Sequence, residues 1–515
     1  MPDKNGFIDS IKAGYSFKGE SFPLGGAMLD GEVLEGTIVQ LPLKTMNRHG
    51  LIAGATGTGK TKTLQVIAEG LSDASVPVLM MDIKGDLSGI AEAGTENDKI
   101  KERYSRIGLT WSARAYPVEL MTLSNEKGVR LRATVTEFGP ILISKILGLN
   151  DTQQGLVAMI FKYCDDNKIP LLDLKDFTKI LQYVSNEGKA ELEKTYGKIA
   201  TTSTGTILRK VIELQQQDAD VFFGEPSFEV DDLMRISNDG GGIINILRVT
   251  DMQNRPKLFS TFMLQLLAEL YAVLPEAGDL DKPKLVLFID EAHLVFQEAT
   301  QALMQQIETV IKLIRSKGVG IFFCTQNPQD VPASVLSQLG LKVQHALRAF
   351  TAADRKTIKQ AADNYPETTY YKVEDLITQM GIGEAFVTLL NEKGIPTPLV
   401  HTMLASPRSR MDVLTDGEID GLIKQSKLVK KYEETIDNES AYEIINDKLA
   451  EAGKKSQEEK TTSRKEKEPP SVIEKVLDNS VTRQVGRTAA SIITRSLLGA
   501  LGLGGRSSKK KSSWF

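Results

Sequence analysis

Cysteine is nearly missing from this chain of 515 residues. The two cysteines, Cys164 and Cys324, lie far apart in apolar or helix-compatible segments. So sparse a set excludes a disulfide framework, and it lacks the paired spacing of a zinc site. We therefore expect a protein of a reducing compartment.

Long apolar runs and an excess of charge of one sign are missing as well. No stretch of about 18 apolar residues occurs, and the first residues contain no apolar signal-peptide region. The sequence therefore predicts neither a transmembrane span nor secretion, and we expect a cytoplasmic protein. Sixty-three Lys and Arg residues against 67 acidic residues give a formal charge of −4. Any contact with nucleic acid must therefore be local, because the chain as a whole is not basic.

A glycine-rich loop between an apolar strand and a helix is the clearest motif present. Residues 54–61 read GATGTGKT, which matches the Walker A pattern of P-loop proteins. Its glycines allow a tight turn whose N–H groups surround phosphates, while Lys60 reaches the β- and γ-phosphates and the Thr61 hydroxyl holds Mg²⁺. The predicted ligands are ATP and Mg²⁺. The predicted nucleotide-binding residues are Gly54, Ala55, Thr56, Gly57, Thr58, Gly59, Lys60, Thr61 and Lys62.

A second motif supplies the acidic residues of a hydrolase. Residues 285–291 read LVLFIDE, an apolar strand that delivers Asp290 to its carboxyl end, where it is expected to hold magnesium. Glu291 follows directly and is placed to act as the general base toward water. Adjacent acids at a strand end favour hydrolysis over transfer to another acceptor, so we predict an ATPase.

Two further turns follow predicted strands. Gln326, after the apolar run 319–325, is the candidate sensor of the γ-phosphate; the alternative is an amide that caps a turn. Residues 82–86, DIKGD, end the run 76–82. Their charged side chains face the nucleotide or a neighbouring subunit, or they belong to a solvated turn.

The chain divides into six expected segments. They are a short N-terminal β segment (1–50), a core in two parts (51–137 and 240–408), a helical insertion (138–239), a polar helical region (409–452), a disordered charged linker (453–471) and a basic amphipathic C-terminal tail (472–515). The expected fold is α/β: a parallel sheet that resumes after the insertion.

The motifs as a set resemble a known family. NRHGLIAGATGTGKT, DIKGDLSG, LVLFIDEAH, IRSKGVGIFFCTQNPQDVP and QLGLKVQHALRAFT together are similar to bacterial HerA-like ATPases, within the HerA/FtsK superfamily, over about residues 25–406. The DxKG turn also resembles that of conjugative coupling ATPases. The resemblance implies a RecA-like P-loop NTPase core with an additional strand, a large helical insertion and a homo-oligomer that forms a hexameric ring.

A ring would place nucleotide between subunits, so that an arginine could act in trans. Such an arginine stabilises charge on the γ-phosphate and contributes about 10³ to 10⁵ in rate where present. Arg315 and Arg348 are the candidates, although each is equally readable as a surface arginine.

The resemblance implies a motor that moves or remodels DNA or RNA. Pore contacts could come from Arg130 and Arg132 or from Arg209 and Lys210, although such charges are usually just solvated. The alternative is a protein-remodelling or signalling ATPase that the C-terminal tail recruits to a protein partner or an anionic membrane surface. The tail carries Arg483, Arg487, Arg495 and Lys509 to Lys511 beside an apolar face; a helix that packs on the ring or pairs subunits would have the same pattern. A kinase or a GTP-specific switch ranks lowest, because no Asn-Lys-x-Asp guanine-reading motif is present.

Overall fold

The computed structural model describes residues 3–251, 255–296, 301–349, 351–434 and 438–462. Contacts divide the chain into two compact units: unit 1 is formed by residues 1–131 and 229–433, and unit 2 by residues 132–228 and 434–515. The six segments expected from the sequence remain a prediction. Among the described residues, no helix is long and apolar enough to span a bilayer.

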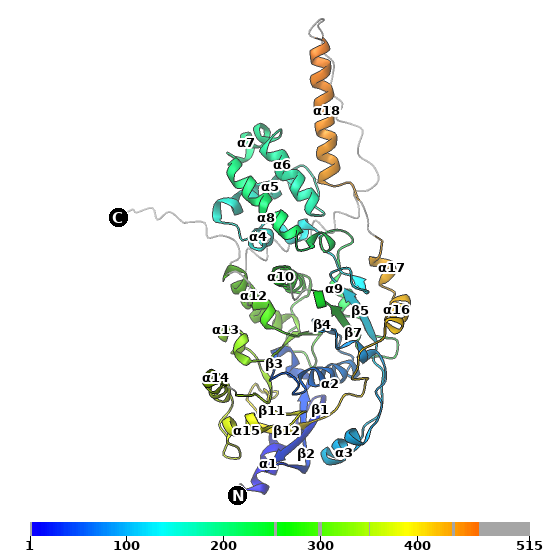
Figure 1. Ribbon diagram of the computed structural model, residues 1–515, viewed down its shortest axis with the longest axis vertical. Helices are drawn as coiled ribbons and strands as arrows, with labels where there is room; N and C mark the ends of the chain where they lie inside the picture. Colours follow the sequence, from blue (N-terminus) through cyan, green and yellow to red (C-terminus); the bar gives the residue numbers. More distant parts are fainter. Residues whose placement is uncertain (1–2, 252–254, 297–300, 350, 435–437, 463–515) are drawn as a thin grey trace, which may run out of the picture. The chain divides into compact units, whose positions relative to one another are not determined.

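Unit 1 is built on one large sheet, whose described part contains twelve strands (Figure 1). Eight neighbouring strands run parallel. In sheet order they are β10 (Leu341–His345), β3 (Gly50–Ala53), β9 (Val319–Thr325), β8 (Leu285–Ile289), β4 (Val78–Asp82), β7 (Ile244–Arg248), β5 (Val118–Thr122) and β6 (Val129–Arg130). Because these strands are parallel, their carboxyl ends share one edge of the sheet, where ligands bind in such folds.

Strand β9 lies between β3, which precedes the glycine loop, and β8, which precedes the acidic pair. Gly50 of β3 pairs with Phe322, and Phe288 of β8 pairs with the same residue from the other side. This order is that of an additional-strand P-loop core, so the predicted fold class is confirmed.

Four antiparallel strands extend the sheet beyond β10. They are β11 (Glu384–Thr388), β12 (Val400–Leu404), β1 (Ser21–Leu29) and β2 (Glu32–Pro42). The expected N-terminal β segment therefore pairs with the end of the core, since Gly25 lies opposite Leu404.

Helices cover both faces of the parallel strands. Helix α2 (Lys60–Asp73) packs Leu64 and Ile67 into one core with Ile52 and Phe322. The next residue of β9, Phe323, points to the other face and contacts Phe296, with ring centroids 5.8 Å apart. The sheet is thus buried on both sides, as its apolar runs require.

The remaining helical elements in the described part of unit 1 lie before, between and after the strands. They are α1 (Lys4–Gly14), η1 (Leu43–Arg48), η2 (Ser88–Ala91), α3 (Asp98–Ile107), α9 (Val230–Leu233), α10 (Pro256–Val273), α11 (His293–Phe296), α12 (Gln301–Ile314), η5 (Arg315–Lys317), η6 (Pro328–Asp330), α13 (Ala333–Leu336), α14 (Ala352–Ala362), α15 (Val373–Gln379), α16 (Asp416–Gln425) and α17 (Val429–Tyr432).

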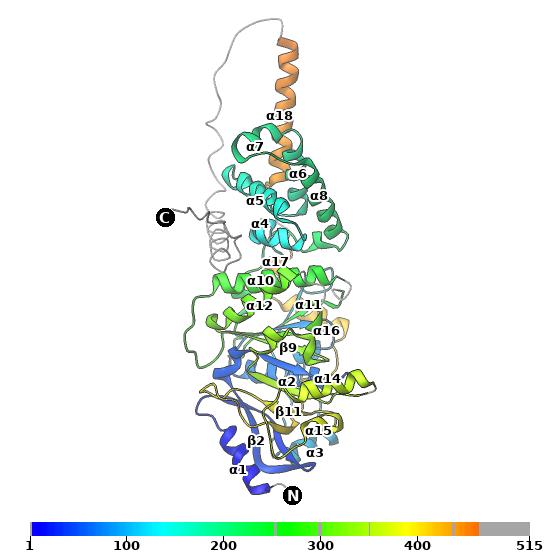
Figure 2. The same cartoon turned by 90° about the vertical axis from the view of Figure 1, so that its left-hand side faces the viewer.

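Unit 2 is helical in its described part, where α5, α6, α8 and α18 lie together (Figure 2). Its elements are α4 (Val135–Ile146), α5 (Asp151–Asp166), α6 (Leu174–Ser185), α7 (Lys189–Tyr196), α8 (Thr201–Gln215), η3 (Ala219–Val221) and α18 (Ala441–Thr462). Helix α18 continues into the expected linker 453–471. The rest of that linker and the expected tail lie outside the described residues.

Candidate nucleotide site

The glycine loop has the backbone shape that a phosphate-binding loop needs. Gly54, Gly57 and Gly59 have φ values of 153°, 78° and 108°, which L side chains rarely adopt. A Cβ atom at Gly54 would lie 2.5 Å from Cβ of His345, so the loop also excludes larger residues on steric grounds. The Ala55 N–H donates to the Ala346 carbonyl at 2.8 Å, which fixes the loop to the end of β10.

Lys60 and the start of α2 make this loop a cationic cradle. The Lys60 Nζ donates to the carbonyls of Gly54 at 2.7 Å and Ala55 at 3.1 Å. Burial lowers the pKa of Lys60. No side chain caps α2, so its first N–H groups are available to an anion. The loop therefore fits a polyphosphate.

The oxygens expected to hold Mg²⁺ are a carboxylate oxygen of Asp290 and the hydroxyl of Thr61. Oδ2 of Asp290 is buried and has no hydrogen-bond partner among the described residues. Burial raises the pKa of Asp290, while the nearby charge of Lys84 acts in the opposite direction. The Thr61 hydroxyl donates to Oδ2 of Asp86 at 3.4 Å. A carboxylate and a hydroxyl beside a phosphate loop form a donor set that suits Mg²⁺.

Glu291 is buried and both of its carboxylate oxygens meet a cation or a ring nitrogen. Oε1 forms an ion pair with Lys84, and Nδ1 of His293 lies 3.2 Å from Oε2. The Glu291 backbone has φ 46°, in the left-handed region. His293 thus contacts the predicted general base.

Gln326 is exposed and follows the last residue of β9. The preceding residue, Thr325, accepts a hydrogen bond from the Gly54 N–H at 3.2 Å. Gln326 is therefore next to the start of the glycine loop. The amide that caps the following turn belongs to Asn327, whose side chain accepts from the Gln329 N–H.

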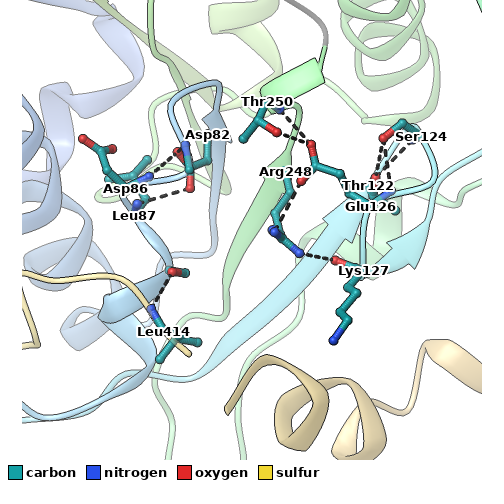
Figure 3. Close-up of polar contacts among 12 residues, drawn as sticks. Asp82, Asp86, Leu87, Thr122, Ser124, Glu126, Lys127, Arg248, Thr250 and Leu414 are labelled. Atoms are coloured by element: carbon teal, nitrogen blue, oxygen red, sulfur yellow. Dashed lines mark hydrogen bonds and ion pairs between the residues drawn. The ribbon is translucent and has the colours of Figure 1, made fainter. Parts of the chain in front are cut away.

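The DIKGD turn is organised by its first acid (Figure 3). Asp82 accepts hydrogen bonds from the N–H groups of Gly85 at 2.7 Å, Asp86 at 3.1 Å and Leu87 at 3.2 Å. Burial raises the pKa of Asp82 to about 7. Asp82 therefore holds its own turn, whereas Lys84 and Asp86 reach the residues of the two motifs.

A second polar cluster lies at the carboxyl ends of β5 and β7 (Figure 3). Oε1 of Glu126 accepts from the Thr250 N–H at 3.0 Å, and Arg248 donates to the Lys127 carbonyl at 2.8 Å. Glu126 and Arg248 also form an ion pair of 3.4 Å. Sequence reasoning missed this cluster, because its members come from separate loops that match no motif.

The two candidate arginines lie at opposite edges of the sheet. Arg315 is exposed in η5, just before β9 begins, and is therefore at the amino edge, away from the loop of its own chain. Arg348 follows β10 at the carboxyl edge; its Nη1 donates to the Thr378 carbonyl at 2.6 Å. A role of either arginine in a neighbouring subunit stays a prediction.

The candidate pore residues differ in exposure. Arg132 is buried, which disagrees with an open pore contact. Arg130 is half-buried and donates to Asn125 at 3.3 Å. On α8, Lys210 forms an ion pair of 2.8 Å with Glu213 and Arg209 is exposed.

Two exposed apolar residues near the loop were not predicted. Ile382 is 71% exposed and Met411 is 37% exposed. The Gly383 N–H, next to Ile382, donates to the Thr58 carbonyl at 3.0 Å. The Lys62 Nζ donates to the Met411 carbonyl. No sequence motif marks either segment, because each reaches the loop from beyond β10.

The glycine loop, the additional strand and the acidic pair define a RecA-like P-loop NTPase fold. The chain belongs to the HerA_C family, described as "Helicase HerA-like C-terminal", whose model matches residues 29–472. The expected membership of the HerA/FtsK superfamily is therefore confirmed.

Curated relatives carry the same family name at low identity. The chain is 20% identical over 359 residues to the DNA double-strand break repair helicase HerA of Sulfolobus acidocaldarius, covering 68% of this chain and 64% of that protein. It is 22% identical over 371 residues to the protein of the same name of Saccharolobus solfataricus, covering 70% and 66%. The chain thus spans slightly less than two thirds of these relatives.

A solved structure shares the fold. The bacterial conjugative coupling protein TrwBdeltaN70, in a trigonal form in complex with sulphate, superimposes with a TM-score of 0.50 at 14% identity. The match covers 79% of this chain and 95% of that one.

Proposed function

We propose that this chain hydrolyses ATP and uses the free energy to move or remodel DNA or RNA. One observation carries the proposal: β8 delivers Asp290 and Glu291 to the same sheet edge as the glycine loop, one strand away from it, with Gln326 at the end of that strand. Nucleophile activation and phosphate binding are thereby brought to one place.

Each residue has a role in this proposal. Lys60 and the N–H groups of the loop bind the phosphates, and Gln326 orients the attacking water. Glu291 accepts the proton of that water. Mg²⁺, held by Thr61 and Asp290, would neutralise charge on the phosphate oxygens.

The base of the nucleotide has a candidate site beside the loop. Ile382 and Met411 belong to segments that bond Thr58 and Lys62, at the start of α2. Exposed apolar side chains next to a phosphate loop suit the flat apolar faces of adenine.

Assembly into a hexameric ring is part of the proposal, as is a cytoplasmic location. The relatives' names support DNA as the substrate that is moved, since they describe a DNA double-strand break repair helicase and a DNA import protein. A ring would bring Arg315 or Arg348 of one subunit to the loop of the next.

The direct test is the rate of phosphate release from ATP with and without DNA or RNA, over a range of salt concentrations. We expect the nucleic acid to stimulate the rate and salt to weaken the stimulation, because phosphate contacts are ionic. Lys60→Ala should abolish the rate, whereas Lys99→Ala, an exposed lysine on α3, should leave it unchanged. A wild-type rate that neither nucleic acid changes at any salt concentration would contradict the motor.

The second candidate is an ATPase recruited by its C-terminal tail to a protein partner or a membrane surface. The sequence pattern that favours it places Arg483, Arg487 and Arg495 in the helix-compatible stretch 481–503, for which an apolar face is expected. Co-sedimentation with anionic liposomes, for the full chain and for a chain that ends at Pro470, tests whether the tail binds a membrane surface. Binding that survives the truncation would remove the tail from the proposal.

A further inference from the structure

Lys84 lies outside the glycine loop and the acidic motif, yet it interacts with residues of both. Its ammonium group forms an ion pair with Oε1 of Glu291, and its charge also acts on Asp290 and Lys60. The side chain of Glu291 is 6% exposed, while that of Lys84 is 35% exposed. The cation thus reaches inward from the rim of the site to a buried carboxylate.

The turn that carries Lys84 is fixed on both sides of it. Before Lys84, the Asp82 carboxylate accepts hydrogen bonds from the N–H groups of residues 85–87. After it, Asp86 accepts a hydrogen bond of 3.4 Å from the Thr61 hydroxyl. Figure 3 shows Asp82 inside this turn, with Asp86 pointing away from it. Lys84 therefore projects from a backbone that is bonded to itself and to α2.

The ion pair between Lys84 and Glu291 reduces the repulsion between negative charges in the site. Asp290 and Glu291 are adjacent buried carboxylates at the end of β8, and the last phosphate of ATP would add negative charge between them and Lys60. Like charges at this range in a poorly solvated site repel strongly. A cation beside Glu291 offsets that repulsion. ADP lacks this phosphate and would leave the pair undisturbed.

We propose that Lys84 is a positioning residue for Glu291, and that their ion pair makes the site prefer ATP to ADP. This inference rests on the proposed ATP hydrolysis and names a residue that adjusts it. Lys84 holds the Glu291 carboxylate in place and neutralises its charge toward the incoming triphosphate. It acts through Glu291, without needing a contact to the phosphate.

The test is a double-mutant cycle on the ratio of dissociation constants for ADP and a non-hydrolysable ATP analogue. It compares wild type, Lys84→Met, Glu291→Gln and the double variant. In the wild-type background we expect Lys84→Met to reduce the preference for the triphosphate about tenfold, with ADP binding little changed. In the Glu291→Gln background only the direct attraction of the Lys84 charge for the phosphates remains. The same change should therefore alter the ratio by clearly less than about tenfold, and the difference between the two backgrounds measures the part that acts through Glu291.

Lys84→Arg should restore most of the preference, because it keeps the charge, and unchanged ADP binding shows that each variant is folded. An equal effect of Lys84→Met in both backgrounds would overturn the proposal in favour of a direct phosphate contact. No effect in either background would overturn it as well.

The outcome is separable from that of the proposed function. A wild type that binds both nucleotides but releases no phosphate contradicts hydrolysis, while the cycle still decides the role of Lys84. A wild type that binds neither nucleotide overturns both.

Discussion

Oγ1 of Thr63 lies 2.9 Å from Nε2 of His345, which joins the helix after the glycine loop to the strand on the far side of β3. Burial, together with the nearby charge of Lys60, lowers the pKa of His345 to about 3. The imidazole is therefore neutral at physiological pH, and a protonated ring would place a second cation beside Lys60. The loop is thus supported by a ring that resists protonation.

Acid should remove the stability that two buried histidines contribute to unit 1. His49 donates from Nε2 to the Ile311 carbonyl and accepts at Nδ1 from the Ile321 N–H. Its pKa is lowered to about 4, chiefly by burial. A base with a depressed pKa contributes its full stability above the unfolded value of about 6.5 and loses it as pH falls below that value. Between pH 7.5 and pH 5 each of the two histidines should cost about 2 kcal/mol.

Denaturant unfolding at several pH values measures this loss. His345→Gln should reduce the dependence on pH below about 6.5, although it also lowers stability at neutral pH. A solvent-exposed histidine keeps nearly the same pKa in the folded and unfolded states, so it would not produce this dependence of stability on pH. Asp82, whose pKa is raised to about 7, contributes in the opposite direction in every variant, so the comparison with the variant isolates the ring. A His345→Gln variant whose dependence on pH between 7.5 and 5 equals that of the wild type would contradict the buried neutral state of His345.

Gln326 should matter for the rate of hydrolysis and little for binding. Its side chain is exposed at the end of β9, so Gln326→Ala should leave the stability within about 0.5 kcal/mol. Loss of a group that orients the water should reduce kcat about 10²-fold or more. Steady-state phosphate release measures kcat, and ADP titration measures nucleotide binding. Gln329→Ala, an exposed amide in the next turn, is the matched control, and an equal loss in both variants would remove Gln326 from the chemistry.

An arginine that acts in trans can be identified by mixing variants. Arg315→Ala or Arg348→Ala should reduce kcat about 10³-fold or more if the residue stabilises the γ-phosphate. Mixed with Glu291→Gln subunits, such a variant should regain activity, because some interfaces then combine an intact Glu291 with an intact arginine. The regained activity is measured by comparing phosphate release from the mixtures with phosphate release from each variant alone. Absence of any regain for both arginines would contradict action across an interface.

Asp176 should be a main support of unit 2. Its Oδ1 accepts from the Ser440 hydroxyl at 2.5 Å and from the Tyr442 N–H at 2.8 Å, and its Oδ2 accepts from the Leu172 N–H at 2.8 Å. Asp176→Ala leaves these donors without a partner, at about 1–3 kcal/mol for each buried group. Hydrogen exchange of α18 and α6 should accelerate, whereas Asp151→Ala, exposed on α5, should leave it unchanged.

The sequence predicted those parts of the fold that depend on local pattern. Strands β3, β8 and β9 are fully buried, so each is a continuous apolar run that ends in a recognisable motif. Strand β5 was not predicted, because VELMT at 118–122 carries Glu119, which pairs with Arg235 at 2.7 Å. That partner lies far along the chain, so the burial of Glu119 leaves no local signal.

The candidate site was predictable to the same extent. Lys60, Asp290 and Glu291 belong to motifs with a defined spacing, and the parallel sheet places them at one edge. Lys84 was assigned to a turn with two readings, since no pattern tells which way a turn side chain points. Its pairing with Glu291 depends on β4 and β8 being neighbours, which follows from pairing across some 200 residues of sequence.

Unit 2 is assembled from two stretches of chain that are separated by six of the twelve described strands of unit 1. Ser440, just before α18, and Tyr442 of α18 donate to the Asp176 carboxylate of α6, so residues 132–228 alone lack part of their packing. During synthesis the first stretch leaves the ribosome long before α18 exists. Unit 2 must therefore mature after its host sheet has been made, and it cannot be excised or transplanted as one continuous piece.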